Sequence, residues 1–318
     1  MYFNERSELY SHPFRTGPSQ DWIQNVKTKM SIEEIAGFLF PATLNDAEYE
    51  SSYVCSPYNA LISYSKDELV KINNRMLRIM LILLIHSIGK ILKLCKVNKN
   101  FCINNFLLST NPYPKWLGEG AEEHLNESKK RYPSHAIMYR SLNYHTNKAL
   151  IHHLQQLGFI LVASRQVYLF DLELANYKSK NNFNNDRRTL AKTNYKLVMH
   201  DQISEKDYAD ILKLYNDLYL EKYSKHNPQF TLKLIAYWHQ KKLLTMMGLR
   251  DQQGILQNCC LNLSSGASQF KMLRGGIPFI EYTAAYINHL PLYRRITWKT
   301  VQALLNGIFV SILKKYQL

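Results

Sequence analysis

The sequence predicts an α/β (α+β) protein in which helices flank a mixed central sheet, and three observations support this. The second half of the 318-residue chain alternates between apolar runs of strand length and longer segments of helical periodicity. Turn residues such as Gly158 and Asp251-Gln-Gln-Gly254 separate these runs. The first half carries longer helical patterns, so we expect it to be more helical. Such alternation is typical of helices packed on a sheet.

The start of the chain is polar and contains two prolines and a glycine, so we expect residues 1–20 to form a loose N-terminal tail. Ser31-Ile-Glu-Glu34 has the spacing of a capping box, which predicts the start of a helix. Residues 55–64 favour irregular chain that leads into a strand. We expect residues 21–132 to form an N-terminal α/β unit.

A second capping box, Ser65-Lys-Asp-Glu68, predicts a long helix that runs to about Lys96. Its apolar residues recur every three or four positions, which predicts that one face lies in the core; these are Leu69, Ile72, Met76, Ile79 and Leu83. The longest uncharged stretch, residues 79–89, is too short to cross the ~30 Å core of a bilayer. We interpret the segment as a buried helix, and a helix lying on a membrane surface is the alternative.

The second half begins after the polar segment of residues 118–133, where we place the domain boundary, and extends over residues 133–318. The predicted strands are residues 136–142, 159–170, 196–199, 243–250, 255–257, 261–263 and 279–286. The predicted helices are residues 146–157, 177–195, 204–225, 228–239 and 298–315.

The chain is strongly basic, with 40 Lys and Arg residues against 25 Asp and Glu residues and a net charge of +15. This excess favours anionic partners such as a phosphate-bearing cofactor, RNA or an acidic membrane surface, although a general basic bias gives the same number. Five cysteines without regular spacing predict neither a disulfide framework nor a zinc site. We therefore expect a cytoplasmic protein without a metal.

Several stretches of the second half resemble a known family. These are Gly158-Phe159, the strand Arg165-Gln-Val-Tyr-Leu-Phe-Asp171, the basic helix ending in Asp186-Arg-Arg-Thr-Leu-Ala-Lys192, the hairpin of residues 243–257, and residues 261–271. Together they resemble the Fem type of the GNAT superfamily of N-acyltransferases, over about residues 135–290. The resemblance implies transfer of an acyl or aminoacyl group to an amine acceptor, with acyl-CoA (acetyl-CoA) or an aminoacyl-tRNA as donor. It also implies that the hairpin is central to the sheet and that residues 21–132 form a partial unit of the same kind.

One departure from the family pattern concerns the cofactor. GNAT enzymes hold the pyrophosphate of coenzyme A on a glycine-rich turn before a helix, where backbone N–H groups bind the anion. No such turn occurs here, and after Gln257 the chain passes directly to what resembles a later strand. The domain is therefore expected to be incomplete after Gln257 and to bind coenzyme A weakly or not at all.

The resemblance also points to candidate catalytic residues in the strand of residues 279–286. Acyl transfer needs a base for the amine and an acid for the leaving group. Glu281 is the candidate base and Tyr282 the candidate acid. Because neighbours in a strand point to opposite faces, at most one of them lines the cleft. A tyrosine that simply packs its ring is the structural alternative.

The candidate cofactor-binding residues follow a predicted strand. Ser264, Ser265 and Gly266 let a ligand approach backbone N–H groups at a helix start. Lys271 and Arg274 are three residues apart, so they are expected to share a helix face and bind one anionic group. A capped helix with solvated cations is the alternative.

A basic helix supplies candidate substrate-binding residues, namely Arg187, Arg188 and Lys192, whose charges suit tRNA or lipid headgroups. A merely solvated face is the alternative. Two other functions stay open: a catalytically decayed GNAT-fold protein that acts as a basic binding module, and a peripheral membrane-associated protein. Motifs of serine hydrolases, P-loop proteins, zinc proteases and dinucleotide-binding enzymes are absent from the sequence.

Overall fold

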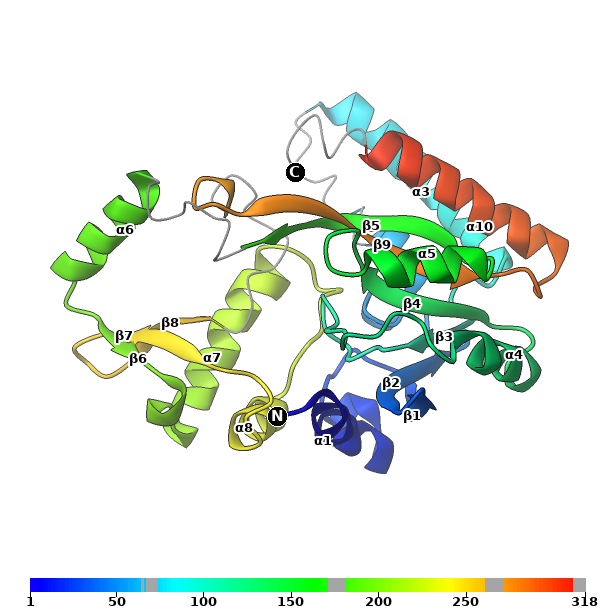
Figure 1. The fold of residues 1–318 in the computed structure, drawn as a ribbon. Coiled ribbons are helices and arrows are strands. Elements are labelled where there is room, and N and C mark those ends of the chain that lie inside the picture. The colour runs from blue at the N-terminus through cyan, green and yellow to red at the C-terminus, as the bar shows by residue number, and fades with distance from the viewer. Residues whose placement is uncertain (64–65, 67–73, 171–180, 261–270, 311–318) are drawn as a thin grey trace.

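The fold is mixed α/β, as the sequence predicts (Figure 1). The computed structural model describes residues 1–63, 66, 74–170, 181–260 and 271–310. The helices of the described residues are α1 (Phe3–Thr16), α3 (Arg75–Leu94), α4 (Ala121–Arg131), α5 (Lys148–Gln156), α6 (Asn181–Lys192), α7 (Tyr208–Tyr215), α8 (Leu232–Gln240) and α10 (Leu292–Leu304). The strands are β1 (Lys29–Ile35), β2 (Phe38–Asn45), β3 (Asn100–Ile103), β4 (Ala136–Leu142), β5 (Ile160–Leu169), β6 (Lys196–Val198), β7 (Met247–Arg250), β8 (Leu256–Cys260) and β9 (Ile277–Tyr286).

The larger sheet has the strand order β1-β2-β3-β4-β9-β5, and only the β3–β4 pair is parallel. Helices α4 and α5 cover one face through a core that includes Leu125, Leu150 and Leu154. Helices α3 and α10 lie on the other face, where Leu92 and Trp298 pack on the strands (Figure 1). The result is a three-layer arrangement, with each face of the sheet buried by helices.

The expected domain boundary near residue 132 falls between β3 and β4, which pair with each other. Strands from both predicted units therefore share one sheet. The segment before the boundary is α4, whose buried face includes His124 and Leu125.

The smaller sheet is antiparallel, has the order β6-β7-β8, and packs with α7 and α8 (left side of Figure 1). The predicted hairpin exists as β7 and β8. Its predicted place at the centre of the main sheet is wrong, because its pairing partner is the short β6 instead of β4, β5 or β9. The predicted late strand of residues 261–263 lies outside the described residues.

The prediction of a loose N-terminal tail is also wrong, because residues 3–16 form α1. Tyr10 and Phe14 are four residues apart and bury their rings in the core beside α8. Pro13 is inside the helix and lacks the N–H that would bond the carbonyl of Leu9. That carbonyl accepts a hydrogen bond from the Tyr237 hydroxyl of α8 at 2.7 Å instead. The proline thus leaves the Leu9 carbonyl free to accept a hydrogen bond that links α1 to α8.

Two further local predictions fail. Ser31-Ile-Glu-Glu34 is part of β1, which pairs with β2 along its whole length, so the capping-box spacing here is coincidental. Residues 59–63 form a π-helical turn where we expected a strand.

The long predicted helix is present as α3, and residues 65 and 67–73 of that prediction lie outside the described residues. Its predicted core face is wrong: Met76 is 78% exposed and Leu83 is 62% exposed. Leu92 is buried, and Ile85 and Ile88 pack against the core. The helix is apolar around most of its circumference, so periodicity alone did not identify the face that docks. None of the helices that the structure describes is both long and apolar enough to cross a bilayer.

Candidate functional site

Two irregularities of the main sheet meet at one level of β9. Strand β4 gains a residue between Tyr139 and Leu142, and Leu142 then pairs with Tyr282. Strand β5 gains a residue between Ala163 and Arg165, and Arg165 then pairs with Glu281. Bulges interrupt the ladder and redirect side chains, and they are frequent beside functional sites. Both neighbours of β9 are therefore distorted next to Glu281.

A cavity of about 180 Å³ lies on the α3 and α10 side of these bulges. Its walls come from β3, β4, β5, β9, α10 and the segment of residues 53–61. The apolar part of the wall includes Met138, Val162 and Trp298, and the polar part includes Arg140, Arg165 and Glu281. An apolar cavity with a few convergent polar groups is the usual form of a small-molecule site.

Glu281 is the most notable group in this wall because it is 1% exposed. Its Oε2 accepts a hydrogen bond from Nε of Arg165 at 2.8 Å. Its Oε1 has no hydrogen-bond partner in the part of the chain that the structure describes. A buried carboxylate oxygen without a partner is costly, so this atom is suited to receive a donor from a ligand.

The guanidinium groups of Arg165 and Arg140 donate hydrogen bonds to loop residues that lie outside the strands of the sheet. Arg165 also donates to the Ser109 carbonyl and to the Thr110 hydroxyl. Arg140 donates to the Val54 carbonyl at 2.6 Å and to Oδ1 of Asn105 at 2.9 Å. The loop of residues 104–111 therefore fixes two cations beside the cavity.

The two cysteines of the cavity wall are not suited to nucleophilic catalysis. Burial raises the pKa of Cys55 to about 12 and that of Cys102 to about 12, despite the nearby charge of Arg140. Both thiols are therefore protonated at neutral pH, and the thiolate is the reactive form. The carboxylate of Glu281 is the basic group that the cavity offers.

Tyr282 points to the other face of the sheet, as the alternation of strand residues requires. Its ring lies 5.7 Å from that of Tyr144, and burial together with Tyr144 raises its pKa. Tyr282 is absent from the cavity wall, whereas Glu281 lines it. The expectation that at most one of the two lines a cleft agrees with this geometry.

The two candidate anion-binding cations make different contacts in the structure. Lys271 is 3% exposed, and its Nζ lies 5.7 Å from the centre of the Tyr168 ring. Arg274 makes a bidentate ion pair with Asp186 of α6, at 2.6 and 2.8 Å. Lys271 is buried against Tyr168 and Arg274 is paired with α6, so binding of one anionic group by both stays a prediction. Ser264, Ser265 and Gly266 lie outside the described residues.

Arg187, Arg188 and Lys192 are exposed on α6, which has no buried residue. They lie on a solvated helix and do not line the cavity. Among the described residues, no three His, Cys, Asp or Glu side chains are grouped as metal ligands. The cavity is also far smaller than the ~300–1,000 Å³ of typical ligand pockets, so it fits a small molecule and not a whole coenzyme A.

The sequence pointed to Glu281 but not to its partner Arg165 or to Arg140 of the same cavity wall. A usable signal was present, since each is the one charged residue of a largely apolar strand. Charged residues are rarely placed in such strands unless they have partners.

Comparisons of the chain with protein-family models, with curated proteins and with solved structures find no match. The resemblance to Fem-type GNAT proteins therefore stays a prediction from the residues.

Proposed function

We propose that the cavity binds a small primary amine against Glu281 and that the chain transfers an acyl or aminoacyl group to this amine. The observation that carries the proposal is the buried Oε1 of Glu281, which has no hydrogen-bond partner among the described residues and belongs to a residue that lines the cavity. An ammonium or amine group supplies the donor that this oxygen lacks. The resemblance of residues 135–290 to GNAT N-acyltransferases supplies the reaction class.

In the proposed reaction, Glu281 accepts a proton from the bound amine, and the amine nitrogen attacks the carbonyl carbon of an activated ester or thioester. The N–C bond forms, the bond from carbon to the leaving oxygen or sulfur breaks, and the proton passes from Glu281 to the leaving group. Arg165 orients the carboxylate by holding Oε2 at 2.8 Å. The chain's own contribution is thus to bind, orient and deprotonate the acceptor.

The binding step is tested with a panel of small primary amines, each paired with the alcohol of the same shape, titrated calorimetrically. Glu281→Gln keeps the size of the side chain and an acceptor for Arg165 but removes the charge. A charge-assisted hydrogen bond contributes about 1.5–3 kcal/mol, so we expect roughly ten- to hundredfold weaker amine binding. Glu119→Gln, which changes a carboxylate outside the cavity wall, is the matched control. Equal amine binding by wild type and Glu281→Gln would exclude the proposed site.

The transfer step is tested with acetyl-CoA and with aminoacyl-tRNA as donors, in the presence of the amine that binds most tightly. We expect acylated amine to accumulate with wild type and to fall strongly with Glu281→Gln. Amine binding without transfer from either donor would instead assign the chain to the binding modules. Thermal unfolding followed by circular dichroism shows whether each variant remains folded.

A further inference from the structure

Helix α3 docks on the sheet by one face and exposes a second apolar face to solvent. We call this second face the apolar stripe; its members recur at helical spacing and are Met76, Met80, Leu83, Leu84, Ile91 and Leu94. Their exposed fractions lie between 54% and 78%. A contiguous apolar surface of this kind on a folded protein marks a binding surface.

The charges around the apolar stripe all have one sign. Helix α3 contains four Lys and Arg residues and no Asp or Glu; the cations are Arg75, Arg78, Lys90 and Lys93. Arg75, Lys90 and Lys93 lie along one line of the helix beside the stripe. Lys93 also lies over the rings of Tyr49 and Tyr58, and Arg78 is in line with the docked residues Ile85 and Leu92. Helix α10 on the same side of the sheet also lacks acidic residues and exposes Leu292, Tyr293 and Ile296. This side of the molecule is therefore apolar and cationic together.

A cationic pocket of about 420 Å³ lies where the end of α3 meets the start of α10, and Lys96, Lys99, Ser134 and Arg294 line it. Arg294 is 2% exposed and donates to the carbonyls of Cys95, Ser134, Lys96 and Lys99. No carboxylate among the described residues pairs with this guanidinium. A buried cation without a counter-charge favours an anion nearby.

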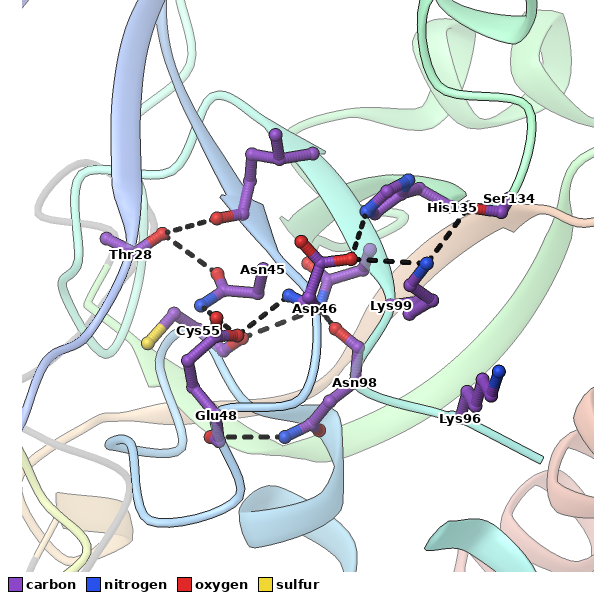
Figure 2. A network of polar contacts seen from close by, with 12 residues as sticks. Thr28, Asn45, Asp46, Glu48, Cys55, Lys96, Asn98, Lys99, Ser134 and His135 are labelled. Atoms are coloured by element: carbon purple, nitrogen blue, oxygen red, sulfur yellow. Dashed lines mark hydrogen bonds and ion pairs between the residues drawn. The ribbon is translucent and has the colours of Figure 1, made fainter. Parts of the chain in front are cut away.

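Figure 2 shows the lysines of this pocket. Lys99 lies between Asp46 and Ser134, at 3.2 Å from the carboxylate and 3.1 Å from the hydroxyl. Lys96 extends away from that network, with no dashed contact drawn to it (Figure 2). The pocket thus presents the Ser134 hydroxyl and the charge of Lys96, a combination that suits a phosphate group.

We propose that α3 lies on the surface of an anionic phospholipid bilayer, with the apolar stripe among the acyl chains. Lys90 and its neighbouring cations contact headgroups, and the pocket at Lys96 and Arg294 receives a lipid phosphate. A helix whose exposed apolar face is bordered by cations binds anionic membranes in this orientation. The helix lies in the plane of the interface and does not cross the bilayer.

A second copy of the chain is a less suitable occupant of this surface. Two α3 helices packed face to face would bring their cations together, and neither α3 nor α10 offers an acidic residue to compensate them. Like charges placed opposite one another weaken association. An anionic bilayer removes this repulsion, so charge complementarity favours the lipid surface.

The apolar contribution is tested by co-sedimentation of the full chain with phosphatidylcholine vesicles, with and without phosphatidylglycerol. We expect binding to the anionic vesicles that weakens as salt is added. Leu83→Glu places a charge in the apolar stripe at a residue that is already exposed, so the fold should survive. It should weaken vesicle binding by about tenfold or more. Leu117→Glu is the matched control, because Leu117 is 59% exposed and lies outside α3.

The electrostatic contribution is tested with Lys90→Glu, compared with Lys130→Glu on α4, which covers the opposite face of the sheet. A lysine near an anionic surface contributes about 1 kcal/mol, so we expect at least a fivefold loss for Lys90→Glu only. Circular dichroism melting curves of all four variants verify that they are folded. Equal vesicle binding by wild type, Leu83→Glu and Lys90→Glu would overturn the proposal. So would a wild-type dimer in ultracentrifugation that Leu83→Glu dissociates, without vesicle binding by either, since α3 would then be an interface between copies.

Discussion

Lys271 is buried beside Arg165, and its ammonium group is therefore costly to keep charged. Burial lowers the pKa of Lys271 from 10.5 to about 8, and the charge of Arg165 adds to this effect. Its Nζ has no hydrogen-bond partner among the described residues and faces the Tyr168 ring. The ammonium group thus makes a cation–π contact with Tyr168 but no hydrogen bond among the described residues.

This leads to a prediction about stability and pH. Below about pH 8 both folded and unfolded chains hold the Lys271 proton, so the full cost of the buried charge is present. Between about 8 and 10.5 the unfolded chain binds more protons, so the free energy of unfolding should rise with pH. Lys271→Met should raise the free energy of unfolding at pH 7 by roughly 1–3 kcal/mol and should flatten that rise.

Urea unfolding at a series of pH values measures both effects, with Lys130→Met as the exposed control. A less stable Lys271→Met variant at pH 7 would show that the ammonium group makes a favourable contact in the folded chain.

At the same scale, the limits of prediction from sequence are visible in Glu281. Its strand and its orientation follow from local alternation, so both are predictable from the sequence. Its ion pair with Arg165 and the cavity beside it depend on bulges in β4 and β5. A bulge changes which residues of a strand face the cavity. The bulges include Ser141 and Ser164, and the local sequence around these serines does not predict a bulge. Glu281 could therefore be predicted as a site residue, whereas its arrangement with Arg165 and the cavity could not.

At the scale of elements, α1 is fastened by aromatic packing that includes one unsatisfied polar atom. The Tyr10 ring lies 5.2 Å from that of Phe106 and 6.0 Å from that of Trp238. The Tyr10 hydroxyl is buried and has no hydrogen-bond partner in the described part of the chain, and burial raises its pKa. The ring stabilises the docking of α1, whereas the hydroxyl opposes it.

Two substitutions separate these contributions. Tyr10→Phe keeps the ring and removes the hydroxyl, so it should be neutral or stabilise the fold by about 1 kcal/mol. Tyr10→Ala also removes the ring and should destabilise the fold by about 3–5 kcal/mol. Thermal and urea unfolding of both variants provide the test. A loss of more than about 1 kcal/mol in Tyr10→Phe would mean that the hydroxyl has a partner in solution.

Elements with strong local signals were predicted well, and those that depend on distant partners were not. The predicted strand at residues 136–142 coincides with β4, and β5 and α5 lie within the predicted ranges. Strand β1 was mistaken for a helix because its polar spacing matches a capping box. In the structure Glu33 of β1 bonds to His124 and Arg131 of α4, a contact that only the folded chain creates. The prediction of the buried face of α3 was wrong for a related reason. When a helix is apolar on most sides, its sequence does not show which side packs against the rest of the protein.

At the scale of the whole molecule, acid should destabilise the fold in two ways. Burial alone would raise the pKa values of Glu33, Asp46 and Asp207, but hydrogen bonds and neighbouring cations bring each below its ordinary value. The partners are His124 and Arg131 for Glu33, Lys99 and His135 for Asp46, and Arg250 and Ser204 for Asp207. Their contribution is complete above about pH 5 and is lost as the pH falls through the lowered pKa values. The net charge, already +15 at pH 7, also becomes more positive and increases repulsion.

We therefore expect the melting temperature to be steady near neutral pH and to fall steeply below about pH 4. Glu33→Gln should lower the free energy of unfolding at pH 7 by roughly 2 kcal/mol, because Arg131 and His124 lose their anion. The same variant should show a shallower loss of stability in acid. Circular dichroism melts between neutral and acidic pH measure both, and an unchanged acid slope in the variant would argue against a role for Glu33.

The position of β9 has a consequence for how the chain folds during synthesis. Strands β4 and β5 do not pair with each other, and β9 joins them although it follows both in the chain. Until residues 277–286 leave the ribosome, β4 and β5 each present an unpaired edge, and open edges promote association with other chains. The wall that carries Glu281 is also missing until then, because Glu281 belongs to β9 itself. A nascent chain halted before β9 would therefore leave β5 without a strand partner, expose one edge of β4 and lack the Glu281 wall of the site, so the sheet and the site are completed by the same strand.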